Sequence, residues 1–365
     1  MSLKRFFSPT FIVGLFLAGY LALVLVRYGG DPLAFARLGA GFTSGIPVDE
    51  QRLGYDGQFF YYIALDPTPA QAALHLDIPA YRYQRILYPL LARLLALAQP
   101  AFIPWTLVMV NWVAQVVGTA LLERGLVQKG VSRWYALTYG LWFGLVAAVR
   151  LDLAEPLCYA LVVAAWWAYD RERRGWAAVL LGLALFTKET AIFFLAAYLL
   201  AALFERRWSL ALINLIPLGL YTLFQGWLYL TFGRLGLGSG GYMGTSFEII
   251  PYMGLWRIAL VRLPIFGLYL LLMGLPVVLP SLWALAAATR RLLRRNFAPT
   301  IWALALNAAI IPFTPFSTFL EPLGMFRFMI GLVVATLFFG TQIKSVRVLN
   351  YSLYWIAALV LITQE

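Results

Sequence analysis

Groups that carry chemistry are scarce in this sequence of 365 residues, which has one cysteine, one histidine and only 12% charged residues. The single cysteine, Cys158, excludes a disulfide within the chain, and its apolar surroundings are typical of a small buried residue rather than a reactive thiol. The single histidine, His75, excludes a site built from several histidines, and we expect it in a solvated loop. The sequence also lacks a Walker loop, a Cys/His cluster and a dinucleotide fingerprint.

Apolar residues dominate instead, since they make up 62% of the chain and give a mean hydropathy of +0.80. A soluble domain needs far more charge, so this composition predicts an integral membrane protein. No hydrophilic run is long enough for a separate soluble domain. We therefore predict an all-α fold, a polytopic transmembrane helical bundle of about 11 spans, formed by one membrane-embedded domain over residues 1–365.

The net charge of +12 is distributed in a way that argues against nucleic acid as a partner. Basic residues cluster in the short loops between apolar segments, for example at Arg171, Arg173 and Arg174. This is the positive-inside pattern, so membrane lipids are the expected partners of that charge. Lys4 and Arg5 place the N-terminus on the same, cytoplasmic side, and the first apolar run is expected to be a retained span.

Threading the spans from that side leaves two long segments on the opposite, extracytoplasmic side. Residues 27–85 form the first loop, which carries the most polar motif. Residues 231–263 form a glycine-rich loop followed by an interfacial helix, and the loop suits a lid over a cavity as well as it suits a disordered connector. Residues 86–98 are too short for a comfortable span, so we expect an interfacial or partly re-entrant helix, and whether they cross the membrane stays open.

The first candidate for a site is Asp56, in the motif Tyr55-Asp56-Gly57-Gln58. Gly57 would allow the backbone to approach a ligand closely, and Gln58, beside the carboxylate, is predicted to bind substrate or phosphate. The residues leave two interpretations open. Asp56 is either a catalytic group or the N-cap of an interfacial helix.

Two arginines, Arg82 and Arg85, lie among tyrosines just outside the predicted membrane. Guanidinium groups bind phosphate with two parallel hydrogen bonds, so this stretch suits a phosphate or pyrophosphate group. The alternative is that the arginines reach ordinary lipid phosphates while the tyrosines form an aromatic belt.

Three further motifs place charge on the same predicted side, and a charge near hydrocarbon costs roughly 2.5–3.5 kcal/mol or more, which makes a convergent set a functional-site hypothesis. Each also has a structural interpretation, in which neighbours neutralise one another or close a tight turn. The residues in these motifs that we predict to bind substrate or phosphate are Asp152, Glu155, Lys188, Glu189, Glu321 and Arg327.

These motifs together resemble the GT-C superfamily of membrane glycosyltransferases. The branch concerned contains the second mannosyltransferase of glycolipid-anchor synthesis and its bacterial relatives. The resemblance covers roughly residues 50–200 and rests on Tyr-Asp-Gly-Gln-Phe-Phe in the first outer loop, on Ile86-Leu87-Tyr88-Pro89, on Asp152-Leu-Ala-Glu155-Pro156 and on Thr187-Lys-Glu-Thr190. It implies a GT-C-like fold and a polyprenyl-phosphate sugar donor. It also implies transfer on the extracytoplasmic side, with Asp56 as the catalytic residue.

Together with this resemblance, the residues lead us to expect a glycosyltransferase, and the resemblance implies that it moves a sugar from a polyprenyl-phosphate donor to a lipid, glycan or other acceptor. Asp56 would act as general base, with inversion at the anomeric carbon, in a bacterial inner membrane with the site facing the periplasm. The family often has a paired acidic motif, whereas Gly57 follows Asp56 here, so no cofactor is implied and a divalent metal stays open. The alternatives are a transporter or flippase for a lipid-linked or polar substrate, and a non-catalytic scaffold.

Overall fold

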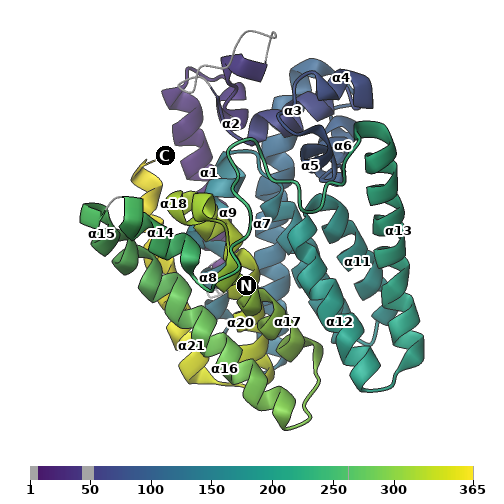
Figure 1. The fold of residues 1–365 in the computed structure, drawn as a ribbon, viewed down its shortest axis with the longest axis vertical. Helices are drawn as coiled ribbons and strands as arrows, with labels where there is room; N and C mark the ends of the chain where they lie inside the picture. Colours follow the sequence, from purple (N-terminus) through teal and green to yellow (C-terminus); the bar gives the residue numbers. More distant parts are fainter. Residues whose placement is uncertain (1–6, 43–52, 262, 365) are drawn as a thin grey trace.

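Helices form all the regular secondary structure in the part of the chain that the computed structural model describes, which is residues 7–42, 53–261 and 263–364 (Figure 1). The all-α prediction is therefore confirmed for these residues. Lys4 and Arg5, on which the predicted side of the N-terminus rests, lie outside them. The single-domain assignment and the predicted loop boundaries stay predictions.

The N-terminal part begins with one long apolar helix and continues with short ones. Ser8 starts the first helix by accepting a hydrogen bond of 3.2 Å from the backbone of Phe11, and a proline follows it at the first helical position. The elements up to the second long helix are α1 (Pro9–Arg27), α2 (Leu33–Ala36), η2 (Ala40–Phe42), α3 (Gly57–Leu65), α4 (Pro69–Ala73), α5 (Pro79–Tyr83), α6 (Leu87–Leu95), η4 (Pro100–Phe102) and α7 (Ile103–Gln128).

The middle of the chain forms helices of intermediate length around the core. Their bounds are η5 (Arg133–Tyr135), α8 (Ala136–Gly140), α9 (Phe143–Arg150), α10 (Glu155–Tyr169), α11 (Arg174–Thr187), η6 (Glu189–Ala191), α12 (Ile192–Phe204) and α13 (Trp208–Phe232). Helices α11 and α12 form a short hairpin. Lys188 ends α11 in an extended conformation, so the chain reverses at Lys188 and Glu189.

The C-terminal part follows a long connection over residues 233–252, which we call the strap. Its elements are α14 (Met253–Val261), α15 (Leu263–Met273), the π-helical turn η7 (Gly274–Val278), α16 (Leu279–Leu293), α17 (Pro299–Ala309), η8 (Ile311–Phe313), α18 (Phe316–Leu320), α19 (Pro322–Phe328), α20 (Ile330–Gln342), α21 (Val346–Leu353) and η9 (Tyr354–Gln364). In Figure 1 the strap crosses the front of the molecule from the end of α13 to α14.

Five stretches in the described residues have the length and composition of membrane spans: 9–27, 100–128, 208–232, 263–293 and 322–342. Shorter apolar helices accompany them at 174–187, 189–204, 299–313 and 346–362. This is the pattern of an α-helical, membrane-embedded protein. The count of about 11 spans stays a prediction. Helix α6 has nine residues, which cover only ~14 Å at 1.5 Å per residue and fall short of a bilayer of ~30 Å.

Helix α20 forms the centre of the core, since every residue from 330 to 341 is buried. Phe338 stacks on Trp166 of α10 with ring centroids 4.7 Å apart. A Cβ added at Gly125 of α7 would meet that tryptophan ring at 2.4 Å, so the glycine allows α7 to pack against α10. The lone cysteine, Cys158, lies in this core with no exposed surface, as expected.

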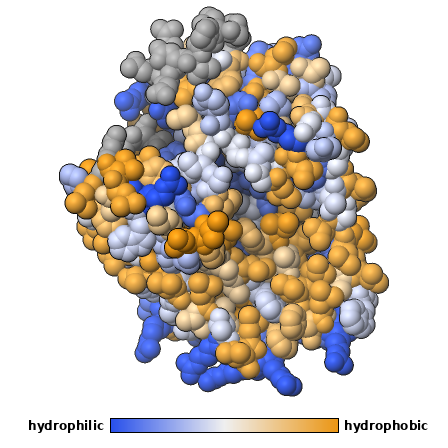
Figure 2. Space-filling view, viewed as in Figure 1, coloured by the Kyte–Doolittle hydropathy of each residue, from blue (hydrophilic) through white to orange (hydrophobic). Residues whose placement is uncertain are grey.

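The basic loops gather at one end of the molecule, as the charge pattern predicts. Lys129, after α7, forms an ion pair of 2.8 Å with Asp170, after α10. Phe204, at the end of α12, packs on Phe297, which precedes α17. Figure 2 shows hydrophilic side chains at this lower end, below a largely hydrophobic belt. We call it the basic end.

Candidate functional site

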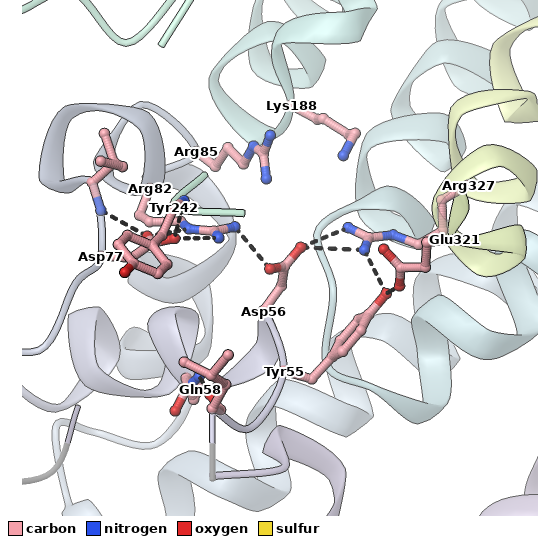
Figure 3. A network of polar contacts seen from close by, with 12 residues as sticks. Tyr55, Asp56, Gln58, Asp77, Arg82, Arg85, Lys188, Tyr242, Glu321 and Arg327 are labelled. Carbon is pink, nitrogen blue, oxygen red and sulfur yellow. Dashed lines mark hydrogen bonds and ion pairs between the residues drawn. The ribbon is translucent and has the colours of Figure 1, made fainter. Parts of the chain in front are cut away.

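Asp56 lies between two arginines that come from distant parts of the chain (Figure 3). Its Oδ1 is 3.0 Å from Nη1 of Arg82, and its Oδ2 accepts hydrogen bonds of 3.2 Å from both Nη1 and Nη2 of Arg327. The Asp56 side chain is 25% exposed, while those of Arg82 and Arg327 are 6% and 11% exposed. The carboxylate is therefore the accessible part of a largely buried charged group.

The N-cap interpretation of Asp56 is wrong for this structure. Asp56 does precede α3, but its backbone is helical and its side chain makes no capping hydrogen bond. Its carboxylate points away from the helix amides and toward the guanidinium groups. The local geometry therefore leaves Asp56 free for a role other than capping.

The two arginines extend into a chain of alternating charges. Arg82 donates to Asp77 at 2.7 and 2.8 Å, and Nε of Arg327 donates to Oε1 of Glu155 at 2.7 Å. Glu155 is 1% exposed and also accepts a bond of 3.0 Å from Lys188. The order Asp77, Arg82, Asp56, Arg327, Glu155, Lys188 satisfies each buried charge with an opposite neighbour, as burial in an apolar protein requires.

A second ion pair lies beside this chain. Arg85 donates two hydrogen bonds to Glu189, at 2.8 and 2.5 Å, and its side chain is 2% exposed. Tyr81 lies between the two arginines of this segment, with its ring 5.0 Å from the guanidinium carbon of Arg82 and 4.4 Å from that of Arg85. Figure 3 shows the side chains of Arg85 and Lys188 pointing toward the space beside Asp56.

These ion pairs differ from the structural interpretation that the sequence left open, in which charged neighbours in the chain neutralise one another. Lys188 and Glu189 are neighbours but do not pair with each other, because the extended backbone at Lys188 sends the two side chains to different partners. Glu155 likewise does not pair with Arg150, whose guanidinium instead donates to the carbonyl of Ala34 at 3.0 Å.

Tyr55 joins Glu321 to the site. Its hydroxyl donates to Oε1 of Glu321 at 2.7 Å and accepts from Nη1 of Arg327 at 3.1 Å. Glu321 is exposed at the start of α19, and Arg327 is in the same helix. The predicted pair of Glu321 and Arg327 is thus linked through a tyrosine.

The strap covers the Arg82 side of the site. The backbone amide of Tyr242 donates to Oδ2 of Asp77 at 3.0 Å, and a Cβ added at Gly241 would lie 2.8 Å from Nη2 of Arg82. At its other end the strap is fixed to α18, since Thr245 and Ser317 exchange hydrogen bonds of 3.0 and 3.1 Å. In position, the strap therefore agrees with the lid interpretation of the loop.

The charges around Asp56 set its protonation. Burial by itself would raise the pKa of Asp56, but the positive charges of Arg82 and Arg327, with smaller effects of Arg85 and Lys188, outweigh it and hold the pKa well below its usual 3.8. Asp56 is therefore an ionised carboxylate at neutral pH, able to accept a proton.

Gln58 is not part of this cluster, contrary to the prediction. It is 1% exposed, its Oε1 accepts from the amide of Gly39 at 2.9 Å, and its Nε2 donates to the carbonyl of Leu53 at 2.6 Å. It lies two residues beyond Asp56 on a helix, about 200° around the axis, and so faces the other way. Its role is to hold the backbone before α3.

Gly57 makes a close contact, but with the protein rather than with a ligand. A Cβ at this position would lie 2.2 Å from the carbonyl oxygen of Leu151. The glycine therefore lets α3 start directly against the turn between α9 and α10, and this contact places Asp56 near Glu155.

Asp152 is in that turn but outside the charge chain. It has no exposed surface, its backbone is left-handed with φ of 50°, and neither carboxylate oxygen has a hydrogen-bond partner among the described residues. Burial raises the pKa of Asp152 well above its usual value, with Arg150 opposing the shift. The predicted role of Asp152 in binding substrate finds no support in this position.

His75 is not simply solvated, because its Nδ1 lies 2.7 Å from the carbonyl oxygen of Phe42 and its ring stacks on Tyr62. Within the described residues, no group of three or more His, Cys, Asp and Glu side chains has an arrangement that could hold a metal ion.

Sequence reasoning missed three contributors: Tyr55, Asp77 and Tyr242. Asp77 precedes Arg82 by five residues in a polar segment, which is a usable signal, and Tyr55 adjoins Asp56. Tyr242 contributes only its backbone amide, which no residue type could reveal.

Comparisons of the chain with protein-family models, with curated proteins and with solved structures returned no match.

Proposed function

We propose that the protein is a membrane glycosyltransferase of the GT-C type, which uses a polyprenyl-phosphate sugar as donor. The observation that carries this proposal is the position of Asp56, a partly exposed carboxylate with a guanidinium group at each of its oxygens. A base and cations for a leaving phosphate are then within one small site. The motif resemblance of residues 50–200 supports the same class.

In the proposed reaction a hydroxyl oxygen of the acceptor attacks the anomeric carbon of the donor sugar. The new glycosidic C–O bond forms as the bond between that carbon and the phosphate oxygen breaks, and its electron pair stays on the polyprenyl phosphate. The hydroxyl proton passes to Asp56. One displacement without a covalent sugar intermediate inverts the configuration at the anomeric carbon.

The cations of the site have two roles in this scheme. Arg82 and Arg327 neutralise Asp56 through their ion pairs, and a donor phosphate would compete with Asp56 for the same guanidinium groups. Once these groups turn to the phosphate, the pKa of Asp56 rises, since burial remains while part of the compensating charge is shared. Donor binding would thus make Asp56 a better base.

Lys188 extends the cationic side. Glu155 accepts from both Lys188 and Arg327, and Arg327 also contacts Asp56, so Lys188 ends the chain of alternating charges and shares its carboxylate with a second cation. Arg85, in contrast, is matched one to one by Glu189. We therefore assign the developing phosphate charge to Arg82, Arg327 and Lys188, and a supporting role to the pair of Arg85 and Glu189.

The donor chemistry also fits the surroundings. A polyprenyl chain is soluble only in the bilayer, and helices with exposed apolar residues bring the site to the membrane. In our proposal the site faces the extracytoplasmic side of a bacterial inner membrane, opposite the basic end, as the positive-inside rule predicts. The acceptor would be a lipid or glycan hydroxyl.

The test is a transfer assay on purified protein with a panel of radiolabelled polyprenyl-phosphate hexoses and a lipid extract as acceptor. The panel is run with and without EDTA, which addresses the metal requirement that the sequence left open. Asp56→Asn keeps the shape of the side chain but removes the base, so transfer should fall by roughly 10²–10⁴-fold.

The matched control is Asp170→Asn, which makes the same change in an ion pair at the basic end and should leave transfer unchanged. Wild-type turnover by Asp56→Asn would overturn the proposal. Movement of labelled lipid across vesicles without any glycosidic product would favour a flippase instead.

A further inference from the structure

A groove of about 770 Å³ lies between α11 and α13, and none of its lining residues belongs to the charged site around Asp56. Apolar side chains line most of it, and five of these are 38–64% exposed: Trp176, Val179, Leu183, Ile216 and Leu220. The volume falls within the range of roughly 300–1,000 Å³ typical of ligand pockets. Because α13 has the length and composition of a membrane span and α11 is a shorter apolar helix beside it, we expect the groove to open toward lipid.

The floor of the groove is a direct contact between the two helices. A Cβ added at Gly182 of α11 would lie 2.8 Å from Cβ of Pro217, which is inside α13, so the two helices touch at this point. Both residues line the groove. The groove is therefore formed by the packing of the two helices.

The two ends of the groove differ in chemistry. One end is at the basic end of the molecule and is lined by Glu172, Arg173 and Arg174. The other end is closed by Phe186, whose ring packs against Tyr221 at 5.5 Å and Phe224 at 5.3 Å. The aromatic end adjoins Lys188, whereas the arginines are separated from it by the 14 residues of α11, or ~21 Å.

The two arginines at the end of the groove that lies at the basic end are available to an anion. Arg173 is exposed, and no hydrogen bond or ion pair of its side chain occurs among the described residues. Arg174 is held in place by Glu172 at 2.6 Å and by the ring of Tyr169 at 3.7 Å, yet its Nη1 is buried without a hydrogen-bond partner. The first turn of α11 adds amide groups that no side chain caps.

We propose that the groove binds an anionic phospholipid, with an acyl chain between α11 and α13 and the phosphate at Arg173 and Arg174. Basic pockets between membrane helices bind anionic headgroups in this way. The position of the cations argues against the sugar donor as occupant. A donor phosphate has to reach Asp56 and Lys188, whereas the cations of the groove lie at the end farthest from Lys188. The lipid is a bound component separate from the proposed reaction.

The test counts lipids retained by the full-length protein in native mass spectrometry, after reconstitution with phosphatidylglycerol or with phosphatidylcholine. Wild type should retain phosphatidylglycerol in preference. Arg173→Ala should weaken retention about fivefold, and Ile216→Trp, which fills the groove, should remove it. The matched controls are Arg294→Ala, another exposed arginine at the basic end, and Leu223→Trp, a 73% exposed residue of α13 outside the groove.

Three results would overturn the inference: equal retention by the variants and their controls, equal retention of the two phospholipids by wild type, or a prenyl phosphate as the lipid displaced by Ile216→Trp. Both altered side chains are exposed, and thermal unfolding checks that each variant is folded. The readout is bound lipid, so the result does not depend on whether the protein transfers sugar.

Discussion

Arg327 donates two hydrogen bonds of 3.2 Å to Oδ2 of Asp56, although 271 residues separate the two in the chain. This contact closes the site between an N-terminal half that supplies the carboxylate and a C-terminal half that supplies a cation. The same guanidinium reaches Glu155 through its Nε, so one planar group fixes the relative position of two carboxylates.

Replacing Arg327 should therefore lower activity by more than the loss of one positive charge alone would. We expect Arg327→Ala to lower sugar transfer by roughly 10²–10³-fold, the range seen when a group that stabilises developing charge is removed. Arg327→Lys should restore little of it, because a single ammonium cannot make the separate contacts of a guanidinium fork. The assay is initial-rate transfer, with Arg347→Ala, an exposed residue at the start of α21, as control. Full activity of Arg327→Lys would show that charge alone matters.

Gly57 should be intolerant of even one methyl group. In Gly57→Ala the new Cβ would lie 2.2 Å from the carbonyl oxygen of Leu151 and 3.0 Å from that of Ala36, so α3 has to move away from the turn that carries Glu155. Overpacking of this kind destabilises a protein by roughly 1–3 kcal/mol. We expect transfer to be at least about tenfold slower, since displacing a catalytic group by ~1 Å can slow a reaction by more than that.

The control for Gly57→Ala is Gly19→Ala, where no atom lies within 4 Å of the added group. That variant should match or slightly exceed wild type in stability, because alanine is the better helix former. Both are measured by transfer rate and by thermal unfolding in detergent. A Gly57→Ala variant with normal rate would mean that the Asp-Gly motif does not position Asp56.

The strap should influence donor binding through Arg82. In Gly241→Ala the added Cβ would lie 2.8 Å from Nη2 of Arg82 and 3.3 Å from Oδ2 of Asp77, which displaces either the strap or the guanidinium. We expect KM for the donor to rise several-fold with a smaller change in kcat. Gly240→Ala is the matched control, since its added Cβ meets only the Cα of Gly244 at 3.8 Å. Equal KM values for the two variants would exclude a role of the strap at Arg82.

Much of the architecture follows from local sequence. Long apolar runs predict helices of membrane-spanning length. The charges at Lys188 and Glu189 indicate a hairpin turn, because charged groups at the end of an apolar helix are tolerated only where they have polar partners. The gathering of basic loops at one end follows from their spacing along the chain. The span count could not be derived in the same way, since several helices are shorter than a bilayer is thick.

The partners of each charge could not be predicted. The side chains of the neighbours Lys188 and Glu189 go to different partners because the backbone at Lys188 is extended. Arg85 and Glu189 form an ion pair although 104 residues separate them in the chain. Tertiary packing decides such pairings, and a single sequence contains no signal for it. Gln58 is different, because its helical spacing from Asp56 places it on the opposite face and could have excluded it from the site.

The pH dependence of stability offers a check on the buried chain of charges. Asp77 is 4% exposed and lies at the end of this chain, against Arg82 and the amide of Tyr242. Burial alone would raise its pKa, but its hydrogen bonds and the charge of Arg82 lower the pKa below the usual 3.8. A carboxylate whose pKa is lower in the folded state stabilises that state above the unfolded pKa, and this contribution is lost as the pH falls below about 3.8.

Asp77→Asn should therefore unfold more easily than wild type, by on the order of 3 kcal/mol, because it leaves Arg82 buried with one partner fewer. The difference should stay constant from about pH 8 to pH 5 and shrink below pH 3.8, where the wild-type carboxylate also takes up a proton. Thermal unfolding in detergent across this range measures it, and Asp170→Asn, from a partly exposed pair, should show a smaller effect at neutral pH. If the difference persisted unchanged to pH 3, or were absent at pH 7, Asp77 would not be the ionised partner that holds Arg82 toward Asp56.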